Sequence, residues 1–274
     1  MAQQLPEAII KVVKKTDKVK VHTFISPEAF LANATHIIEG PHELILIDGQ
    51  FVVPYAMQFR AYADSLKKPI SRVYLTHDHV DHFFGISAAF GDVDVYALKQ
   101  TTEFLKQHGE EIRASRAKVY GDFVPKKVVL PKKEAKAGKE VIDGTNFEFI
   151  CDVDTETGFH LSMKLPDLGI FILQDLIYSG AHVYLTRNFS KWISILEKAV
   201  ASDFGLFLPG HGIPADKKEV QNNINYLKKA KELFEGGAGQ ESLKKSLIEA
   251  FPKRSGAAVF DIYLPRLYGL APPY

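Results

Sequence analysis

The chain concentrates metal-binding types of side chain between residues 76 and 82, where it reads Thr-His-Asp-His-Val-Asp-His. An apolar run at residues 73–75 precedes this segment and predicts a buried strand, from whose end the segment leaves as a loop. Packing such groups together without a cation would bury unpaired polar atoms. The spacing therefore indicates a metal site, whose local candidate ligands are His77, His79, Asp81 and His82.

The ligand types indicate reactive metal chemistry. Neutral imidazoles and carboxylates, with no thiolate among them, suit Zn, Fe, Mn or Co better than a closed structural zinc site, which usually recruits cysteines. Asp78 stands at a spacer position of the pattern HxHxDH, and we interpret it as a solvated or loop-capping residue. His22, His36 and His42 lie in or beside predicted strands, and we interpret them as structural or exposed.

The pattern HxHxDH after an apolar strand resembles that of the metallo-beta-lactamase-fold hydrolase superfamily. Asp175 ends an apolar run at residues 169–174, where the family places its bridging carboxylate. His211 lies in a Pro-Gly-His-Gly turn that is similar to the family's. An early apolar strand ending at Asp48 adds to the resemblance, which covers residues 18–212.

The third metal-binding histidine of the family pattern has three candidates in the sequence. His160 stands where the family often reads TPGH, and His108 and His182 are the alternatives. We prefer His160, because a glycine-containing turn precedes it and a strand-like stretch at residues 161–165 follows it.

The resemblance implies a dinuclear metal centre. One ion would be held by His77, His79 and His160, the other by Asp81, His82 and His211, with Asp175 bridging the two. The implied cofactors are two divalent metal ions. Zinc is the preferred metal, and iron, manganese or cobalt are the alternatives. Two such ions ~3.5–4 Å apart can share a water and lower its pKa to about 7, so that a bridging hydroxide attacks a carbonyl carbon. Asp48 would orient the ligating imidazoles.

Tyr178 bears on the class of substrate. It lies three residues after Asp175, a spacing similar to that of the bridging aspartate and the phenol in metal-dependent N-acyl homoserine lactonases. A phenol there could donate a hydrogen bond to a developing oxyanion, and we therefore assign Asp81 and Tyr178 to the catalytic step. The alternative is that Tyr178 is a packing residue at a strand exit, and His182 could reach the same cleft.

The resemblance thus implies a metal-dependent hydrolase of a small carbonyl substrate, with a lactone or ester preferred. A thioesterase similar to glyoxalase II and a beta-lactamase are alternatives with the same chemistry. A nuclease is disfavoured, because the sequence has no evident large insertion or basic arm. Outside that chemistry, a non-catalytic metal-binding sensor and a mononuclear iron oxygenase remain open.

Periodicity and turn residues predict an α/β chain around these residues. The resemblance implies an αββα sandwich, in which two mixed sheets pack face to face and are flanked by helices, with a C-terminal helical extension. We expect strands at residues 19–24, 35–39, 43–48, 93–96, 140–142, 146–153, 161–165, 169–173 and 204–208. We expect helices from Pro54 onward and at residues 101–114, 189–201, 216–235 and 241–251.

The chain divides into a predicted catalytic domain, residues 1–214, and a helical extension, residues 215–274, that packs on it. Helices of this kind either close over an active site or pair with a second subunit in a homodimer. Residues 115–125 carry Tyr120 and Phe123 in a predicted irregular stretch, which either lines a substrate cleft or fills a hydrophobic seam.

The composition of the chain limits the size of the fold and the classes of partner that can be expected. With 274 residues, 46% of them hydrophobic, the chain is long enough for one α/β domain with a full core. A net charge of +1 gives no electrostatic argument for nucleic acid. No stretch approaches the ~20 apolar residues of a membrane span, so the expected partner is a small-molecule substrate. The start lacks the basic and then apolar pattern of a secretory signal, which favours the cytoplasm.

Overall fold

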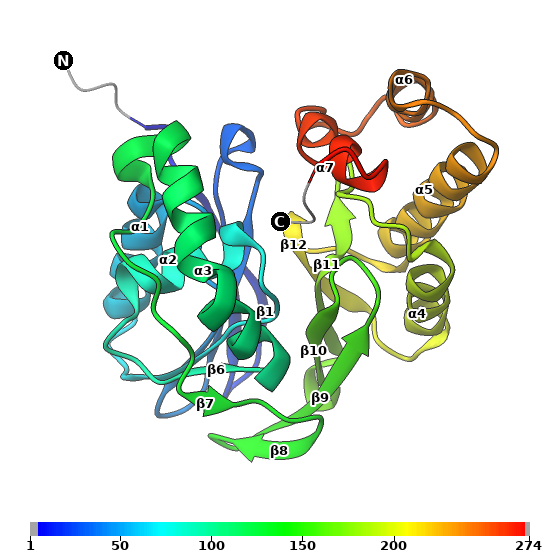
Figure 1. Ribbon diagram of the computed structural model, residues 1–274. Coiled ribbons are helices and arrows are strands. Elements are labelled where there is room, and N and C mark those ends of the chain that lie inside the picture. The colour runs from blue at the N-terminus through cyan, green and yellow to red at the C-terminus, as the bar shows by residue number, and fades with distance from the viewer. Residues whose placement is uncertain (1–4, 272–274) are drawn as a thin grey trace.

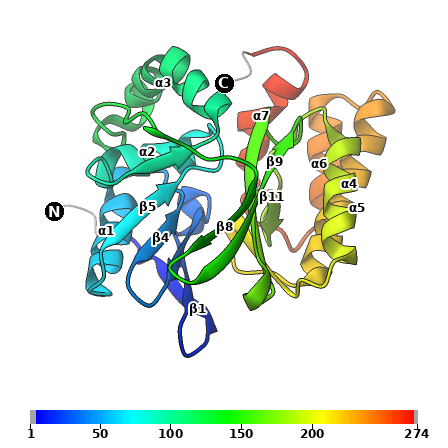
Figure 2. The ribbon, with the colours of Figure 1, turned by 90° about the horizontal axis from the view of Figure 1, so that it is seen from below.

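Two β-sheets lie face to face between two layers of helices in the computed structural model, which describes residues 5–271 (Figure 1). The view from below shows the same four layers, with the early helices outside one sheet and the late helices outside the other (Figure 2). This is the αββα arrangement that the sequence predicted. The helices are α1 (Val53–Ser65), α2 (Val80–Ala89), α3 (Lys99–Tyr120), α4 (Phe189–Ala201), α5 (Lys217–Glu235), α6 (Gln240–Ala250) and α7 (Val259–Leu267).

The first sheet has seven strands in chain order. Its first four strands pair antiparallel, and the remaining pairs are parallel, with α1, α2 and α3 as the crossovers. The strands are β1 (Ile9–Lys15), β2 (Lys20–Ile25), β3 (Ala34–Glu39), β4 (Leu44–Ile47), β5 (Ile70–Tyr74), β6 (Val95–Ala97) and β7 (Lys133–Glu134).

The second sheet has the order β12-β11-β10-β9-β8. Its strands pair antiparallel except for β11 and β12, which are parallel and are joined through α4. Asp143 and Gly144 both have positive φ at the tip of the predicted hairpin, as a tight two-residue turn requires. The strands are β8 (Gly138–Ile142), β9 (Thr145–Val153), β10 (Phe159–Leu165), β11 (Ile170–Ser179) and β12 (Leu206–Gly212).

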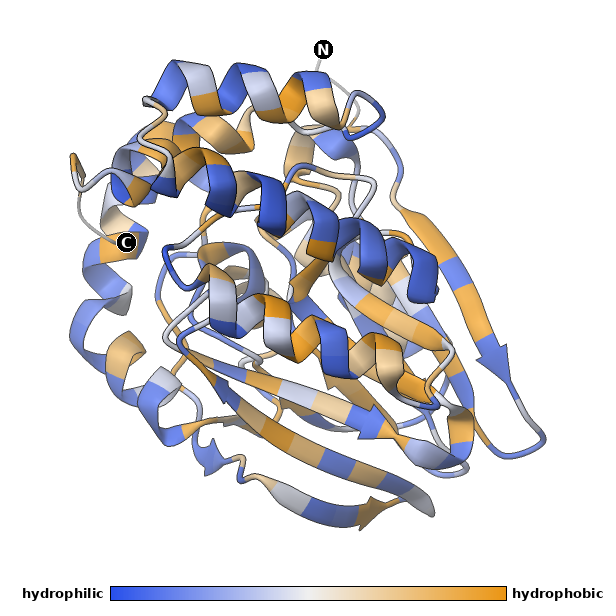
Figure 3. Cartoon of the chain, turned by 90° about the vertical axis from the view of Figure 1, so that its right-hand side faces the viewer, coloured by the Kyte–Doolittle hydropathy of each residue, from blue (hydrophilic) through white to orange (hydrophobic). Residues whose placement is uncertain are grey.

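Buried side chains form three layers that hold the sandwich together. Strand β4 shows the pattern, because Leu44 and Leu46 face α1 and α2 while Ile45 and Ile47 face the second sheet. Each such fully buried side chain contributes about 1.5–3 kcal/mol. Helices α4 and α5 cover the second sheet with their apolar sides and turn polar residues outward (Figure 3).

Several elements differ from the sequence prediction. Strand β1 was not expected, and most of its residues are exposed at the edge of the first sheet. Helix α3 continues through residues 115–120, which were predicted to be irregular, because Arg116, Ala117 and Lys118 favour a helix. It ends at Gly121, whose φ is 54°. Helix α7 lies beyond the last helix that was expected, and Pro265 lies inside it.

The C-terminal helices pack on the same core layer as α4 and β11. Helix α5 begins after Asp216, whose side chain accepts a hydrogen bond from the backbone N–H of Glu219. The predicted division at residue 214, and the predicted homodimer through these helices, stay predictions. Within residues 5–271, no helix combines the length and apolarity needed to cross a membrane.

Candidate metal centre

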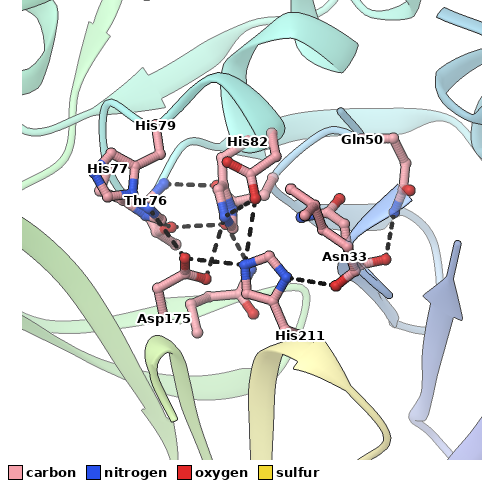
Figure 4. A network of polar contacts seen from close by, with 12 residues as sticks. Asn33, Gln50, Thr76, His77, His79, His82, Asp175 and His211 are labelled. Carbon is pink, nitrogen blue, oxygen red and sulfur yellow. Dashed lines mark hydrogen bonds and ion pairs between the residues drawn. The ribbon is translucent and has the colours of Figure 1, made fainter. Parts of the chain in front are cut away.

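The segment at residues 76–82 leaves the end of β5 and becomes the first turn of α2 (Figure 4). His79 is the residue that precedes the helix, and Asp81 and His82 lie in its first turn. Both His77, before the helix, and His82, in its first turn, are fully buried.

Side chains from this segment meet residues of the second sheet in two groups that share Asp175. In each group, one potential ligand atom from every member lies within 4.8 Å of the others. The groups are His77, His79, Glu156 and Asp175, and then Asp81, His82, Asp175 and His211. Two neighbouring cations that share one carboxylate would fit this arrangement.

Asp175 lies close to three histidines. Its Oδ1 lies 3.2 Å from His82 Nε2, and its Oδ2 lies 3.2 Å from His211 Nε2 and 3.6 Å from His77 Nε2. The Asp81 carboxylate completes the second group, with 3.3 Å between its Oδ2 and His211 Nε2. In Figure 4, dashed lines join the imidazoles of His77 and His82 to Asp175.

Several buried atoms at this point make no hydrogen bond within the described residues. Burying polar atoms without partners is unfavourable, so native sites usually supply each with a hydrogen bond or a cation. The residues present therefore fit a metal centre. The atoms concerned are His77 Nε2, His82 Nε2, His160 Nε2, Glu156 Oε2 and Asp175 Oδ1.

The carboxylates also set the protonation of the nearby rings. Burial lowers the pKa of His211, but Asp175 and Asp81 outweigh it and raise that pKa to about 10. Burial lowers the pKa of His79 as well, and Glu156 outweighs it and raises the pKa to about 9. The site thus has the negative potential that a divalent cation requires.

Asp48 lies behind the ligand segment and fixes it. Its carboxylate accepts hydrogen bonds from the Thr76 backbone N–H and hydroxyl, both at 2.7 Å, and lies 2.9 Å from His82 Nδ1. Gln174 Nε2 donates a further hydrogen bond to it at 2.5 Å. Burial raises the pKa of Asp48, but His82 and these contacts outweigh burial and lower it below its usual range. An ionised Asp48 orients His82 with Nε2 toward Asp175.

Asp175 and His211 depend on irregular backbone. Strand β11 is longer than predicted, so Asp175 lies inside it, in a stretch where the register with β12 shifts and Gln174 has a φ of 43°. A Cβ at Gly210 would lie 1.7 Å from Asp175 Oδ1, so only glycine allows this approach. His211 Nδ1 lies 2.8 Å from the Leu31 carbonyl oxygen, which directs its Nε2 to Asp175.

Glu156 was missed by the sequence analysis. It lies in the turn between β9 and β10, is 1% exposed, and its Oε1 is 3.1 Å from His79 Nδ1. The predicted ligand His160 lies next to it on β10, stacked on His77 with 5.2 Å between ring centroids, but outside both groups. Burial and His77 hold the pKa of His160 well below its usual range, so its ring is neutral. The sequence offered one sign of this residue, an acidic side chain in the predicted turn just before His160.

Tyr178 reaches both acids of the first group. Its hydroxyl donates to Asp175 Oδ2 at 3.1 Å and to Glu156 Oε1 at 3.3 Å, and its ring stacks on His211 with a centroid distance of 4.6 Å. The C-terminal helices fix the backbone of Tyr178. The Asn223 side chain, on α5, accepts a hydrogen bond from the Tyr178 N–H and donates one to the Tyr178 carbonyl oxygen. Arg254 donates to the same carbonyl oxygen at 3.0 Å. Tyr178 is thus held at the edge of both groups.

A cavity of about 320 Å³ opens over the two groups. His79, Asp81, Asp175, Tyr178 and His211 lie at its base, and its walls come from the segment before β3, from α3 and from α7. His182 also lines it, although its Nδ1 lies 3.1 Å from the Tyr226 hydroxyl, outside both groups. Of the predicted alternatives, His108 lies on α3 beside Phe104, also outside both groups. Asp78 accepts a hydrogen bond from Thr157 at 2.8 Å.

A sequence model of the metallo-beta-lactamase superfamily matches residues 30–211, which include the whole ligand segment and His211. The chain belongs to the metallo-beta-lactamase superfamily. It is 24% identical over 195 residues to the alpha subunit of 2,4-dinitroanisole O-demethylase from Nocardioides sp. strain JS1661. That match covers 68% of this chain and 55% of the relative, so the chain spans about half the length of the curated relative it matches.

Solved structures of the superfamily share the fold. A metallo-beta-lactamase from Pontibacter korlensis has a TM-score of 0.63 at 17% identity, covering 80% of this chain and 99% of that one. The enzyme FIM-1 from Pseudomonas aeruginosa, in its mono-zinc form, has a TM-score of 0.62 at 19% identity, covering 82% and 98%. At these identities the similarity establishes the αββα fold alone.

Proposed function

We propose that the protein is a dinuclear metal-dependent hydrolase that cleaves a small carbonyl substrate, with a lactone or ester preferred. The observation that carries the proposal is the pair of buried ligand groups that share Asp175 and face one cavity. Membership of a superfamily of mostly metal-dependent hydrolases supports it. The alternatives with the same chemistry are a thioesterase and a beta-lactamase.

The proposed ligands divide as the two groups do. His77 and His79 would hold one ion with Glu156, and His160 on the adjacent strand would be either a further ligand or a substitute for Glu156. Asp81, His82 and His211 would hold the other ion, and Asp175 belongs to both groups. When bound, two divalent ions, zinc first, would polarise a carbonyl oxygen and lower the pKa of a water to about 7.

The chain's own residues would prepare the substrate. Tyr178 is the phenol at the cavity base, and burial raises its pKa well above the usual range, so it remains a hydrogen-bond donor. From there it would donate to the oxygen on which negative charge develops. Asp48 and Thr76 keep the ligand segment in place, and the apolar cavity walls exclude water from the reacting carbonyl.

A second candidate function follows from the relative named O-demethylase. In that case the protein would remove the alkyl group of an aryl alkyl ether, and the aromatic and aliphatic walls of the cavity would hold the ring. We rank it second, because the relative is only 24% identical.

The test is a substrate screen on protein with quantified metal content. Lactones, aryl esters, thioesters, beta-lactams, phosphodiesters and aryl methyl ethers are compared at equal metal loading. Turnover of lactones or aryl esters above the other classes supports the proposal, and a preference for ethers supports the second candidate. One iron per chain with oxygen uptake would establish an oxygenase instead, and full metal loading without turnover of any class would indicate a sensor.

Tyr178→Phe separates a catalytic phenol from a packing ring. We expect unchanged metal content and a fall in kcat on the best ester of about 10²-fold, because one oxyanion donor is lost. Tyr184→Phe, at the cavity wall, is the comparison variant. Equal kinetics for Tyr178→Phe and the unmodified protein would assign Tyr178 to packing.

A further inference from the structure

Two arginines face the cavity without a carboxylate partner among the described residues. Arg116 projects from α3 and Arg266 from α7, and both line the cavity over the metal groups. Four of the other arginines pair with carboxylates: Arg60 with Asp64 and Asp92, Arg72 with Glu140, Arg113 with Glu110, and Arg254 with Glu219. Arg187 does not line the cavity, and it donates a hydrogen bond to the Leu267 carbonyl oxygen. The two unpaired guanidiniums are therefore available to a ligand.

The fold brings these two side chains together from distant parts of the chain. Helix α3 covers the first sheet and α7 lies beside the second, and both views place the two helices at the same end of the molecule (Figures 1 and 2). Tyr184 lines the same cavity, and its ring centroid lies 5.1 Å from that of His79. Both arginines therefore reach the cavity at whose base the metal-binding groups lie.

The surroundings of the arginines favour an anion. Arg266 Nε is buried and makes no hydrogen bond within the described residues, while another nitrogen of the group donates to the Ile262 carbonyl oxygen. The rest of this wall is apolar, with Ile112, Val259 and Ile262 among its residues. A guanidinium facing an apolar cavity binds a planar carboxylate through paired, charge-assisted hydrogen bonds.

We propose that Arg116 and Arg266 bind a carboxylate on the substrate, at the end of an apolar body whose other end reaches the metal groups. The preferred substrates are then esters or lactones that carry a carboxylate away from the bond that is cleaved. The proposal rests on the proposed function for its choice of ester and lactone. Its binding component stands without turnover.

The experiment compares a carboxylate with its neutral counterpart. Binding of benzoate and benzamide is measured by calorimetry on metal-loaded and on chelator-treated full-length protein, for the unmodified chain and for Arg116→Gln, Arg266→Gln and the double variant. Arg113→Gln is the matched control, because it lies on the same helix, pairs with Glu110 and does not line the cavity. Circular dichroism establishes that each variant is folded.

We expect each single variant to weaken benzoate binding about tenfold, and the double variant more, with benzamide affected less than about twofold. The preference for benzoate should persist after chelation, which separates the arginines from a metal-bound carboxylate. In a parallel assay, 4-carboxyphenyl acetate should lose its KM advantage over phenyl acetate in the same variants, with kcat unchanged.

These measurements test the proposed reaction and the anion site separately. If neither ester is turned over but the benzoate preference depends on both arginines, the proposed reaction is wrong and the anion site stands. Equal loss of benzoate and benzamide, no loss at all, or the same loss in Arg113→Gln would overturn the anion site. A preference that disappears on chelation would assign the carboxylate to the metal ions.

Discussion

The two halves of the candidate centre reach the same point by different routes. One half is local: His77, His79, Asp81 and His82 lie in a single segment, placed by the end of β5 and the start of α2. The other half comes from separate parts of the second sheet, where Glu156 lies in a turn, Asp175 in an irregular strand and His211 on β12. The local half is specified by spacing, whereas the distant half depends on backbone geometry that spacing does not encode.

The strongest test of this comparison removes the one residue common to both groups. Asp175→Ala should reduce metal content from about two ions per chain to one or none and bring turnover to the background rate, because both groups lose a ligand. Elemental analysis of folded protein measures the metal. Asp78→Ala, at the spacer position of the local half, should retain its metal. Full metal content in Asp175→Ala would remove this residue from the centre.

Gly210→Ala tests whether the distant half depends on backbone geometry. The new methyl group would lie 1.7 Å from Asp175 Oδ1, so the carboxylate must move. A displacement of about 1 Å at a reacting centre costs about 10²-fold in rate. We expect that loss, with weaker metal retention on dialysis. Gly205→Ala, where nothing lies within 4 Å of the added Cβ, is the matched control and should behave like the unmodified protein.

A paired substitution decides how the first group is completed. Glu156→Gln should weaken retention of one ion by about 10–100-fold, whereas His160→Gln should have a smaller effect if the ring only supports His77. Competition with a chromophoric chelator measures both affinities. The reverse order would make His160 the ligand and Glu156 its support, and equal losses would place both in the set.

The last prediction concerns stability and not metal or turnover, and it lies outside both halves, at His182. Burial first, and then Arg254, lower its pKa to about 4, while its ring contacts Tyr226 and Phe260. Because the unfolded state protonates near pH 6.5 and the folded state only near pH 4, stability falls as pH drops through this window. The loss reaches about 3 kcal/mol at pH 4. Urea unfolding at pH 7 and pH 4 should show a smaller pH-dependent loss for His182→Gln, and equal losses would contradict it.

The sequence predicted most of the fold because its strands and helices carry regular periodicity. Strands such as β3 and β9 and helices such as α4 and α5 lie within one or two residues of their predicted bounds. The misses have local causes. Strand β1 reads IIKVVKK, in which apolar residues come in pairs and do not alternate with polar ones, and α3 has no apolar stripe beyond residue 114.

Prediction of the site was limited in the same way. The family pattern directed attention to His160, while Glu156 has no partner nearby in the sequence and meets His79 only in the folded chain. The strand that carries Asp175 was expected to end before it, but β11 continues to Ser179 after its irregular stretch. The cavity arginines were not singled out, because α3 and α7 meet only through the tertiary fold.

The hydrogen bonds to the Tyr178 backbone give the C-terminal helices a part in the candidate site. Asn223 and Arg254 hold the backbone on which this phenol is mounted, and Arg266 lies further along the same tail. Residues that we propose to bind and orient the substrate therefore belong partly to a segment that contributes nothing to the proposed ligand set. If these proposals hold, exchanging this segment between homologues would alter substrate selectivity and leave the proposed metal ligands in place.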